Sequence, residues 1–396
     1  MAIVGFIWIF IQVLIGYNLV LPAFIYILSF FRKNNTPVLA SVEGDYAIIV
    51  TAYEQVTNIP AVVESLLKLK HSNYLIYIVA DKCDISSLNF SDDRVIVLRP
   101  PETLASNTRS HFYAINNFKR EHERLTIIDS DNLVHPDYLI ELDRYFYKGY
   151  LAVQGIREAK NLNTTYACLD AARDIYYHFY DGKLLFKVGS SATLAGSGMA
   201  FTTSLYRECL EHLDVQGAGF DKVLQSQIVG RNIRIAFTDR AKVYDEKTTH
   251  SDQLVNQRSR WINTWFKYFK FGFVLLFKGI TTPSWNQFLF GLILLRPPLF
   301  IFLLLSLLFL FANIFISITG AFIWTIAFVV FIAGFYIALA RSETDARIYR
   351  SLINIPKFMF FQVLSLLKAR TANKRSVATK HTYTTTVDQI VKDNES

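Results

Sequence analysis

Two long stretches without a charged residue constrain this chain most. Residues 3–31 and residues 297–340 contain no Asp, Glu, Lys or Arg and are almost entirely apolar. A helix of about 20 such residues spans a bilayer, because it satisfies its own backbone hydrogen bonds there. The first stretch predicts one transmembrane helix within residues 1–32. The second is too long for one helix and predicts two, divided near Ser317 to Gly320.

Basic segments beside these stretches indicate which side of the membrane they face. "FRKNN" follows the first stretch at 31–35, and "RSETDAR" follows the second at 341–347. Loops rich in Lys and Arg stay in the cytosol, so both ends are predicted to be cytosolic and the N-terminus external. A signal peptide is the competing interpretation, but the run is too long and no cleavage site is evident. We predict a multi-pass protein of the cell inner (plasma) membrane.

Other apolar segments predict helices that lie at the membrane surface. Residues 262–278 mix aromatic side chains with Lys, and residues 353–368 precede a strongly basic segment. Residues 284–295 either begin the second span or form another interfacial piece. Region 262–370 is therefore expected to hold interfacial helices and two spans, or three if 353–368 crosses. Residues 371–396 are polar and predict a flexible cytosolic tail.

Composition agrees with this organisation. The chain of 396 residues is 52% hydrophobic and only 19% charged, with a net charge of +8. Its basic residues cluster beside apolar segments, which is typical of cytosolic loops and contact with membrane lipid, and argues against nucleic-acid binding. The three cysteines have no metal-type spacing and are odd in number, which fits a reduced, cytosol-facing domain.

The part between the spans, residues 42–261, alternates strand and helix patterns. Short β-branched runs predict strands at 45–53, 74–81, 95–98 and 125–129, with helical patterns after the first and third. Alternation of this kind predicts an α/β domain with a Rossmann-like, mostly parallel sheet. Ligands bind such sheets at the carboxyl ends of the strands.

Aspartates follow two of these strands. "VADKCD" places Asp81 at the end of one strand, and "IIDSDN" places Asp129 and Asp131 at the end of another. Carboxylate oxygens suit Mg²⁺ or Mn²⁺, which in turn bridge the oxygens of a diphosphate. The alternative is a solvated turn in which Asn132 is a further turn former.

These motifs belong to an ordered set. It runs "TAYE" (51–54), "ADKCD" (80–84), "DSD" (129–131), "GSGMAF" (196–201), "FDKVL" (220–224), "AKVYDE" (241–246) and "QRSRW" (257–261). Over roughly residues 45–270 the chain resembles the membrane-embedded family 2 glycosyltransferases, the group that includes cellulose, hyaluronan and poly-N-acetylglucosamine synthases. The resemblance implies a GT-A-type cytosolic domain with transmembrane and interfacial helices.

The resemblance also implies a role for individual residues. Asp221 would be the general base on the acceptor hydroxyl, and Asp131 would hold Mg²⁺ or Mn²⁺ on the diphosphate. The residues implied to bind the UDP-sugar donor are Thr51, Tyr53, Glu54, Asp81, Asp129, Gln257, Arg260 and Trp261. Those implied to lie at the acceptor are Gly196, Ser197, Gly198 and, again, Trp261.

Elementary chemistry is compatible with these roles. A positioned carboxylate can accept the proton of an attacking hydroxyl, and a metal ion with Arg can stabilise the departing diphosphate. Gln257, Arg260 and Trp261 share one helical face, because they stand at i, i+3 and i+4. Arg258 is expected to point elsewhere.

The chain departs from the family pattern at a few positions. Phe220 stands where the family usually has Glu, so the acid beside Asp221 is lost. Lys82 replaces a residue that is usually small or polar. Only Arg109 and His111 offer positive charge where a Gly-Lys pair is common. Phosphate contact there is therefore left open.

The leading interpretation is an inverting enzyme that adds a hexose or N-acetylhexosamine from a UDP-sugar to a growing glycan, in β-linkage. Three spans are few for an export channel, so a homo-oligomer or an export partner would be needed. One alternative is a single addition to a lipid-linked acceptor. The other is a non-catalytic membrane subunit or transporter, which the charge-free spans and the retained aspartates disfavour.

Overall fold

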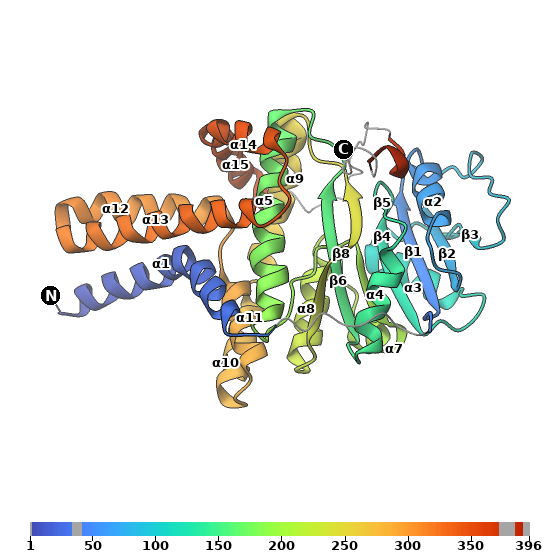
Figure 1. The fold of residues 1–396 in the computed structure, drawn as a ribbon, viewed down its shortest axis with the longest axis horizontal. Coiled ribbons are helices and arrows are strands. Elements are labelled where there is room, and N and C mark those ends of the chain that lie inside the picture. Colours follow the sequence, from blue (N-terminus) through green and yellow to red (C-terminus); the bar gives the residue numbers. More distant parts are fainter. Residues whose placement is uncertain (1, 34–41, 372–384, 391–396) are drawn as a thin grey trace.

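A computed structural model describes residues 2–33, 42–371 and 385–390, which form an α/β domain and a set of apolar helices (Figure 1). The domain is built on one sheet with the strand order β3-β2-β1-β4-β7-β6-β8-β5. The strands are β1 (Tyr46–Tyr53), β2 (Tyr74–Asp81), β3 (Val95–Leu98), β4 (Arg124–Asp129), β5 (Leu133–Val134), β6 (Ala152–Ala159), β7 (Met199–Thr202) and β8 (Ile235–Asp245).

The sheet is mixed but mostly parallel. β1 pairs in parallel with β2 and β4, β2 with β3, and β6 with β8. β7 is antiparallel to both β4 and β6, and β5 is antiparallel to β8. The first five residues of β1 are buried, as expected of a strand covered on both faces. The predicted GT-A-type, Rossmann-like fold is confirmed.

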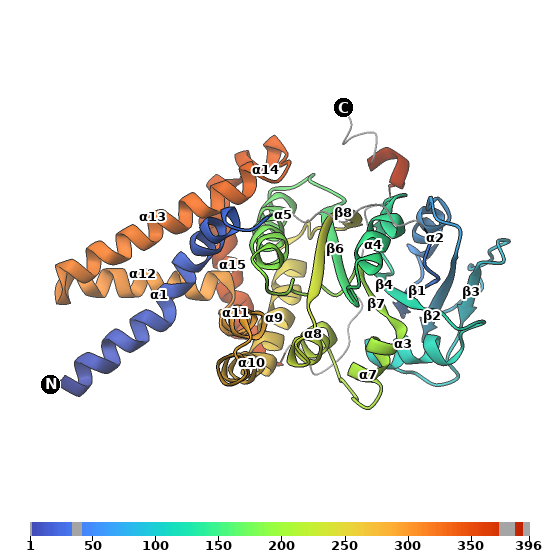
Figure 2. The same ribbon diagram turned by 60° about the horizontal axis from the view of Figure 1, so that its bottom comes forward.

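Helices cover this sheet and connect its strands. They are α2 (Ile59–Leu67), α3 (Asn107–Asn116), α4 (Tyr138–Tyr147), α5 (Thr165–Tyr177), a π-helical segment η1 (His178–Leu184), α6 (Leu185–Lys187), α7 (Thr203–Leu210), α8 (Phe220–Gly230) and α9 (Ser251–Tyr268). The side chains of Ser106, Thr164 and Thr202 cap α3, α5 and α7 by accepting a backbone N–H. α5 and η1 lie between the sheet and the apolar helices (Figures 1 and 2).

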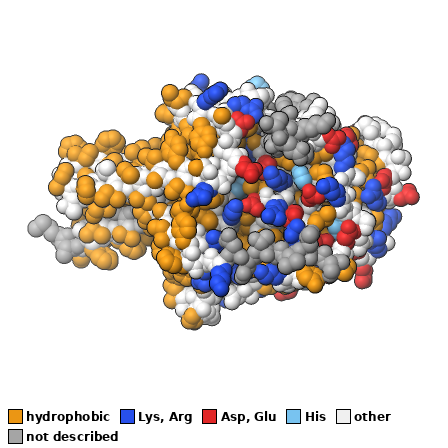
Figure 3. All heavy atoms as spheres, viewed as in Figure 1, with side chains coloured by type: hydrophobic (Ala, Val, Ile, Leu, Met, Phe, Trp, Pro, Cys, Tyr) orange, Lys and Arg blue, Asp and Glu red, His pale blue; other side chains and the backbone are white. Residues whose placement is uncertain are grey.

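Three helices are long and apolar enough to cross a membrane. They are α1 (Ala2–Phe30), α12 (Leu299–Ile316) and α13 (Ile318–Ala340), and they project from one side of the domain (Figure 2). Hydrophobic side chains cover this projection, whereas charged side chains gather on the domain (Figure 3). Ser317 separates α12 from α13 and caps α13 by accepting the N–H of Gly320, which confirms the predicted division.

A polar contact joins the three spans to one another. The Gln12 Oε1 atom accepts hydrogen bonds from Asn313 Nδ2 at 2.6 Å and from Trp324 Nε1 at 2.7 Å. These residues come from α1, α12 and α13. Hydrogen bonds of this kind help hold spans together in lipid, where water cannot replace them.

Shorter helices lie where the spans meet the domain. They are α10 (Lys270–Thr281), α11 (Trp285–Leu295), α14 (Ala346–Ser351) and α15 (Ile355–Lys368), with single 3₁₀ turns η2 (Leu352–Asn354) and η3 (Ala369–Thr371). α10 exposes Phe273, Val274 and Phe277 beside its lysines, which fits the interfacial position predicted for it. Arg296, Pro297 and Pro298 separate α11 from α12, so α11 is not the start of the second span.

The length of α15 tests the alternative that residues 353–368 cross the membrane as a further span. It has 14 residues, and it packs along α9 beside the domain. A helix of this length is too short to cross a bilayer. Within the described residues, three helices are long and apolar enough to cross a membrane, and α15 is not one of them.

The predicted flexible tail needs a correction in one part. Residues 385–390 contact the domain, where Val387 and Ile390 are buried against the side of the sheet that α2 covers. The Asp388 carboxylate pairs with Lys68 Nζ of α2 at 2.8 Å. Val387 and Ile390 stand three residues apart on one helical turn, so both apolar side chains reach the domain together. The rest of the predicted tail, 372–384 and 391–396, lies outside the described residues.

Candidate active site

The sheet aligns the carboxyl ends of β1, β2 and β4. Thr51 lies opposite Asp129, and Tyr53 lies opposite Asp81. Thr51, Tyr53 and Asp129 line a large cavity at this edge. The expected ligand edge of the sheet is therefore the edge where the cavity lies.

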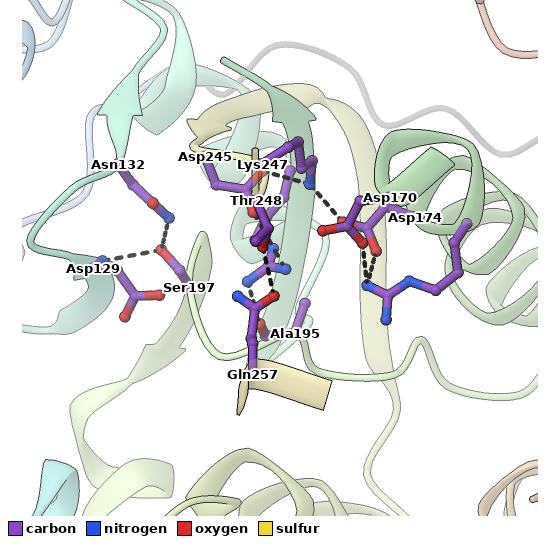
Figure 4. A network of polar contacts seen from close by, with 12 residues as sticks. Asp129, Asn132, Asp170, Asp174, Ala195, Ser197, Asp245, Lys247, Thr248 and Gln257 are labelled. Carbon is purple, nitrogen blue, oxygen red and sulfur yellow. Dashed lines mark hydrogen bonds and ion pairs between the residues drawn. The ribbon is translucent and has the colours of Figure 1, made fainter. Parts of the chain in front are cut away.

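The Asp-x-Asp turn after β4 is held from behind by a buried serine. Ser197 Oγ accepts hydrogen bonds from the Asp129 backbone N–H at 3.0 Å and from Asn132 Nδ2 at 2.8 Å (Figure 4). Lys160 Nζ also donates to the Asp131 carbonyl oxygen at 2.9 Å. Asp129 and Asp131 both line the cavity, so the turn presents its carboxylates to that space.

The residues of the Gly-Ser-Gly segment before β7 differ in what they contact. Gly196 lines the cavity, as expected for a residue near the acceptor. Ser197 is fully buried and supports the aspartate turn, and the Gly198 carbonyl accepts the N–H of Gly155 in β6. Neither Ser197 nor Gly198 lines the cavity.

Two residues expected at the donor are engaged elsewhere. Asp81 is 2% exposed, and its carboxylate accepts the backbone N–H groups of Leu104 at 2.9 Å and Ala105 at 2.7 Å. Glu54 is exposed and pairs with Lys82 at 2.7 Å, an interaction that lowers the pKa of Glu54. Neither side chain is in the cavity wall. The two cationic candidates, for which phosphate contact was left open, also lie elsewhere.

Arg109 and His111 lie away from the cavity. Arg109 forms an exposed pair with Asp214 at 2.7 Å. His111 is buried, its Nδ1 is 2.7 Å from the Tyr206 hydroxyl, and burial lowers its pKa to about 3. Neither residue lines the cavity, so no positive charge reaches it from this stretch of α3.

Asp221 stands in the first turn of α8 and lines the cavity. Its carboxylate is 3.1 Å from Lys222 Nζ. Gly219 directly precedes α8 as its N-cap residue, and its φ of +102° suits glycine. A Cβ there would lie 2.5 Å from Thr264 Cγ2, so α9 packs directly on the start of α8.

Phe220 explains the missing acid in structural terms. Its side chain is 5% exposed and belongs to the core, with its ring centre 5.0 Å from that of His111. A glutamate here would place a carboxylate beside a buried histidine that burial keeps neutral. Phe220 instead packs against His111, and it also lines the cavity beside Asp221.

The "QRSRW" motif lies on α9 at the cavity. Gln257, Arg260 and Trp261 all line it, as their helical spacing predicts. Gln257 Oε1 accepts a hydrogen bond from Thr248 Oγ1 at 3.0 Å. Arg258 was expected to point elsewhere, but it also lines the cavity, where it is buried against the ring of Trp261 on the next turn of α9.

A buried ion network forms the wall beside this motif (Figure 4). Lys247 Nζ lies between Asp174 and Asp245, 2.7 Å from the latter. Asp170 pairs with Arg258 and with Arg173, and Arg173 also pairs with Asp174. Burial raises the pKa of Asp170 to about 6. Of the residues in this network, only Asp245 and Arg258 belong to motifs found in the sequence, because the other partners come from α5 and from Lys247, outside those motifs.

Arg157 of β6 links this network to the aspartate turn. Its Nη1 donates to the Ala195 carbonyl at 2.9 Å, and its Nη2 is 3.5 Å from Asp245. Burial acts to lower the pKa of Arg157, but the carboxylates around it raise the pKa overall. Those carboxylates are Asp245, Asp174, Asp129 and Asp131. Positive charge therefore stands close to the place where a diphosphate is expected.

The cavity has a volume of about 1020 Å³ and joins two different environments. One end holds the aspartate turn, Asp221 and the charged wall. The other end is lined by apolar side chains of the spans and of α15. These are Leu299, Phe300, Leu303 and Leu307 of α12, Phe328, Phe331, Ile332, Phe335 and Tyr336 of α13, and Ile355, Phe358 and Met359 of α15.

No group of three or more His, Cys, Asp or Glu side chains within the described residues forms a ready metal site. A cation would therefore rest on Asp131, with Asp129 near it, and on oxygens that a ligand brings. Mg²⁺ is commonly held in this way, by one or two carboxylates and substrate phosphates. The residues present fit such an ion.

Comparison with solved structures agrees with the fold. A mannosyltransferase from Pyrobaculum calidifontis, PcManGT, solved with GDP-Man and Mn²⁺, matches with a TM-score of 0.54 at 12% identity. The match covers 90% of this chain and 98% of that one. Residues 1–349 of TarS from S. aureus match at 14% identity over 83% and 90% of the two chains, with a TM-score of 0.37. No curated protein matches the sequence.

The sequence itself also matches the model of a protein family. The family described as "Glycosyltransferase like family 2" matches residues 44–264, which include every site residue named above for the catalytic domain. The matched segment spans more than half of the chain, and the protein belongs to glycosyltransferase-like family 2.

Proposed function

We propose that the protein transfers a single sugar from a nucleotide sugar to a lipid-linked acceptor at the membrane. One observation carries this proposal. The cavity that holds Asp129, Asp131 and Asp221 continues to apolar side chains of α12, α13 and α15. An acceptor with a polar head and a hydrocarbon tail matches both ends of such a cavity.

The nature of the far end favours a lipid over a glycan chain. The lining residues that α12 and α13 supply are aliphatic or aromatic, and Tyr336 alone among them carries a hydroxyl. A sugar chain there would lose hydrogen bonds to water and gain few in return. A hydrocarbon tail has no such cost and gains from burial.

Asp221 is the proposed general base. It would accept the proton of the acceptor hydroxyl while that oxygen attacks the anomeric carbon and the nucleoside diphosphate leaves from the opposite face. The product is inverted at the anomeric carbon. Arg260, which also lines the cavity, would stabilise charge on the departing diphosphate.

The donor and the metal follow from the resemblance and from the aspartate turn. A UDP-sugar, carrying a hexose or an N-acetylhexosamine, is the proposed donor, and Asp129 would contact its nucleotide. A Mg²⁺ or Mn²⁺ ion held by Asp131 would neutralise diphosphate charge when bound. PcManGT was solved with GDP-Man and Mn²⁺, so GDP-mannose belongs among the donors to test.

A second candidate is repeated transfer onto a growing β-linked glycan. The observation that favours it is the "QRSRW" motif, whose Gln257, Arg260 and Trp261 line the cavity together with Asp221. In the family that the sequence resembles, this motif accompanies polysaccharide synthesis. With three candidate spans, this function would call for a homo-oligomer or an export partner.

We place the enzyme in the cell inner (plasma) membrane with its catalytic domain in the cytosol. Arg32 and Lys33 follow α1, and Arg341 follows α13, so positive charge lies at the domain end of these spans. Cytosolic loops carry such charge. Nucleotide sugars are also available on that side.

Nucleotide release and product size test the function. The purified protein in lipid nanodiscs is incubated with Mn²⁺, a panel of UDP-sugars and GDP-mannose, with and without an extract of membrane lipids. Lipid-dependent release, giving a lipid that carries one added sugar, supports the proposal. Release that gives a long, lipid-free glycan establishes the second candidate instead. No release with any donor contradicts both and favours a non-catalytic subunit.

A separate pair of variants tests whether Asp131 holds the metal ion. We expect Asp131→Asn to raise the Mn²⁺ concentration needed for half-maximal release, whereas Asp137→Asn, on the exposed surface after the same turn, leaves it unchanged. An unchanged metal requirement in Asp131→Asn would remove this residue from the metal site.

A further inference from the structure

Guanidinium groups and aromatic rings alternate along one wall of the cavity. The Arg258 guanidinium lies 4.1 Å from the centre of the Trp261 ring, and that of Arg173 lies 4.4 Å from the same ring. Arg173 is 5.7 Å from the centre of the Tyr177 ring, and Arg296 is 5.3 Å from it. All five residues line the cavity. We call them the arginine ladder.

The ladder leads from the catalytic domain to the membrane. Arg258 and Trp261 belong to the "QRSRW" motif on α9, and Arg173 and Tyr177 belong to α5. Arg296 follows α11 and stands three residues before the start of α12. The ladder therefore ends where the apolar part of the cavity begins.

Some buried N–H groups of the arginines in the ladder have no hydrogen-bond acceptor in the described structure. Arg258 and Arg296 are 2% and 6% exposed, and each makes its ion pair through Nη2, with Asp170 and Asp181 respectively. Within the described structure, Arg258 Nε and Nη1, Arg173 Nε and Arg296 Nη1 have no hydrogen-bond acceptor. A buried polar group without a partner costs about 1–3 kcal/mol. These four buried atoms belong to side chains that line one wall of the cavity, where the phosphate of a ligand could supply the acceptors.

The linked ion pairs beside the ladder carry one more cation than carboxylates, although the cavity lining as a whole holds more carboxylates than cations. The linked ion pairs beside the motif contain the cations Arg157, Arg173, Lys247 and Arg258 and the carboxylates Asp170, Asp174 and Asp245. Four cations against three carboxylates leave one positive charge. Arg296 and Asp181 form a separate, balanced pair.

We propose that the arginine ladder binds the phosphate of the acceptor, which would make the acceptor a lipid phosphate or diphosphate ester rather than a neutral glycolipid. This inference rests on the lipid-linked acceptor proposed above. The phosphate lies between the two parts already placed, with the reacting hydroxyl at Asp221 and the tail beside α12 and α13. Guanidinium groups suit it, because their N–H donors match phosphate oxygens in pairs.

The donor diphosphate is the competing occupant of the ladder. Arg258 lies in the motif implied to close over the donor, so its spare donors alone do not distinguish the two ligands. Arg296 does, because it stands at the membrane end, next to the start of α12. The test therefore centres on Arg296.

Binding of two lipids that differ only in the phosphate tests the proposal. Farnesyl phosphate and farnesol are titrated into the full-length protein in nanodiscs, without donor and with saturating UDP and Mn²⁺. We expect farnesyl phosphate to bind about 10-fold or more tightly than farnesol, from hydrogen bonds to a charged group. We expect UDP to leave that preference intact, and inorganic phosphate alone to bind weakly, because it lacks the tail.

The variants keep the carboxylate partner balanced. Arg296→Gln alone would leave Asp181 buried without its cation, so the paired variant Arg296→Gln with Asp181→Asn is tested beside it. We expect the paired variant to bind farnesol as the wild type does, and to lose most of the preference for the phosphate. Arg231→Gln, which breaks a surface pair with Glu208, is the matched control and should keep the preference.

Each contrary result has a separate meaning. Equal binding of the two lipids by the wild type, or an unchanged preference in the paired variant, overturns the phosphate site and leaves a neutral lipid acceptor. Displacement of farnesyl phosphate by UDP assigns the ladder to the donor and also overturns the proposal. Failure of both lipids to bind removes the lipid acceptor itself and the present inference with it.

Discussion

The Arg258 guanidinium lies over the ring of Trp261 on α9, with the guanidinium carbon 4.1 Å from the ring centre. They stand three residues apart, so this contact is local to the helix. A residue distant in sequence fixes where this pair lies in the fold, because Arg258 is also paired with Asp170 of α5, 88 residues away. The pair therefore fixes the "QRSRW" helix against α5 and holds Trp261 at the cavity.

Breaking the Arg258–Asp170 pair from one side should destabilise the protein. Arg258→Met leaves Asp170 buried without its nearest cation, and the remaining ion pair with Arg173 is longer, at 3.4 Å. Loss of one member of a buried pair typically costs about 3–5 kcal/mol, so we expect a clear fall in the melting temperature. The double variant Asp170→Leu with Arg258→Met should lose less than Arg258→Met alone. A double variant whose loss equals the sum of the two single losses would show that the groups are not coupled.

Asp221→Asn tests the proposed base. We expect the rate of transfer to fall by about 10²–10⁴-fold, because the amide cannot accept the proton, with little change in the donor concentration needed for half-maximal rate. Asp239→Asn is the control, since Asp239 forms an exposed pair with Lys183 and is not in the cavity wall. Full activity of Asp221→Asn would exclude this carboxylate as the base.

Gly219→Ala tests the contact between α8 and α9. The new Cβ would lie 2.5 Å from Thr264 Cγ2 and 2.7 Å from Tyr268 Cε2, at a φ of +102°. We expect a fall in stability and a loss of transfer, because the start of α8 carries Asp221. Gly149→Ala separates strain from contact, since its φ is +90° and no atom lies within 4 Å of its Cβ. It should cost about 1–3 kcal/mol from strain and leave transfer intact. Equal effects of the two substitutions would contradict the packing role.

His111 should make the protein less stable in acid. Burial lowers its pKa from 6.5 to about 3, so the unfolded chain binds the proton before the folded chain does. Its contribution is complete above pH 6.5 and is lost as the pH falls toward 3, by up to about 1.4 kcal/mol per pH unit.

The measurement is the melting temperature of wild type and of His111→Gln between pH 7.5 and pH 5.5, a range chosen around the ordinary histidine pKa of about 6.5. The gap between the two proteins should narrow as the pH falls. His212→Gln, at an exposed position, should instead run parallel to the wild type. A constant gap for His111→Gln would mean that His111 does not titrate differently on folding.

The sequence alone determined the features that depend on local pattern. Uncharged runs predicted the three helices that are long and apolar enough to cross a membrane, and the last two of these are divided at Ser317, as the sequence indicated. Strand and helix periods gave the α/β domain. Strand ends gave the aspartate turn at the ligand edge, because parallel strands share one carboxyl edge.

Only the tertiary structure decided which side chains face the cavity. Asp81 was expected to contact the donor, and Ser197 the acceptor. Instead, Asp81 accepts a hydrogen bond from the backbone N–H of Ala105, and Ser197 accepts one from the backbone N–H of Asp129. Each of these bonds holds a loop that is distant in sequence. Arg258 was expected to face away, yet Asp170 holds it in the cavity wall. The continuation of the cavity to the spans was equally hidden, because it depends on how α12, α13 and α15 pack beside the domain. Such contacts join segments far apart in the chain, and no local pattern records them.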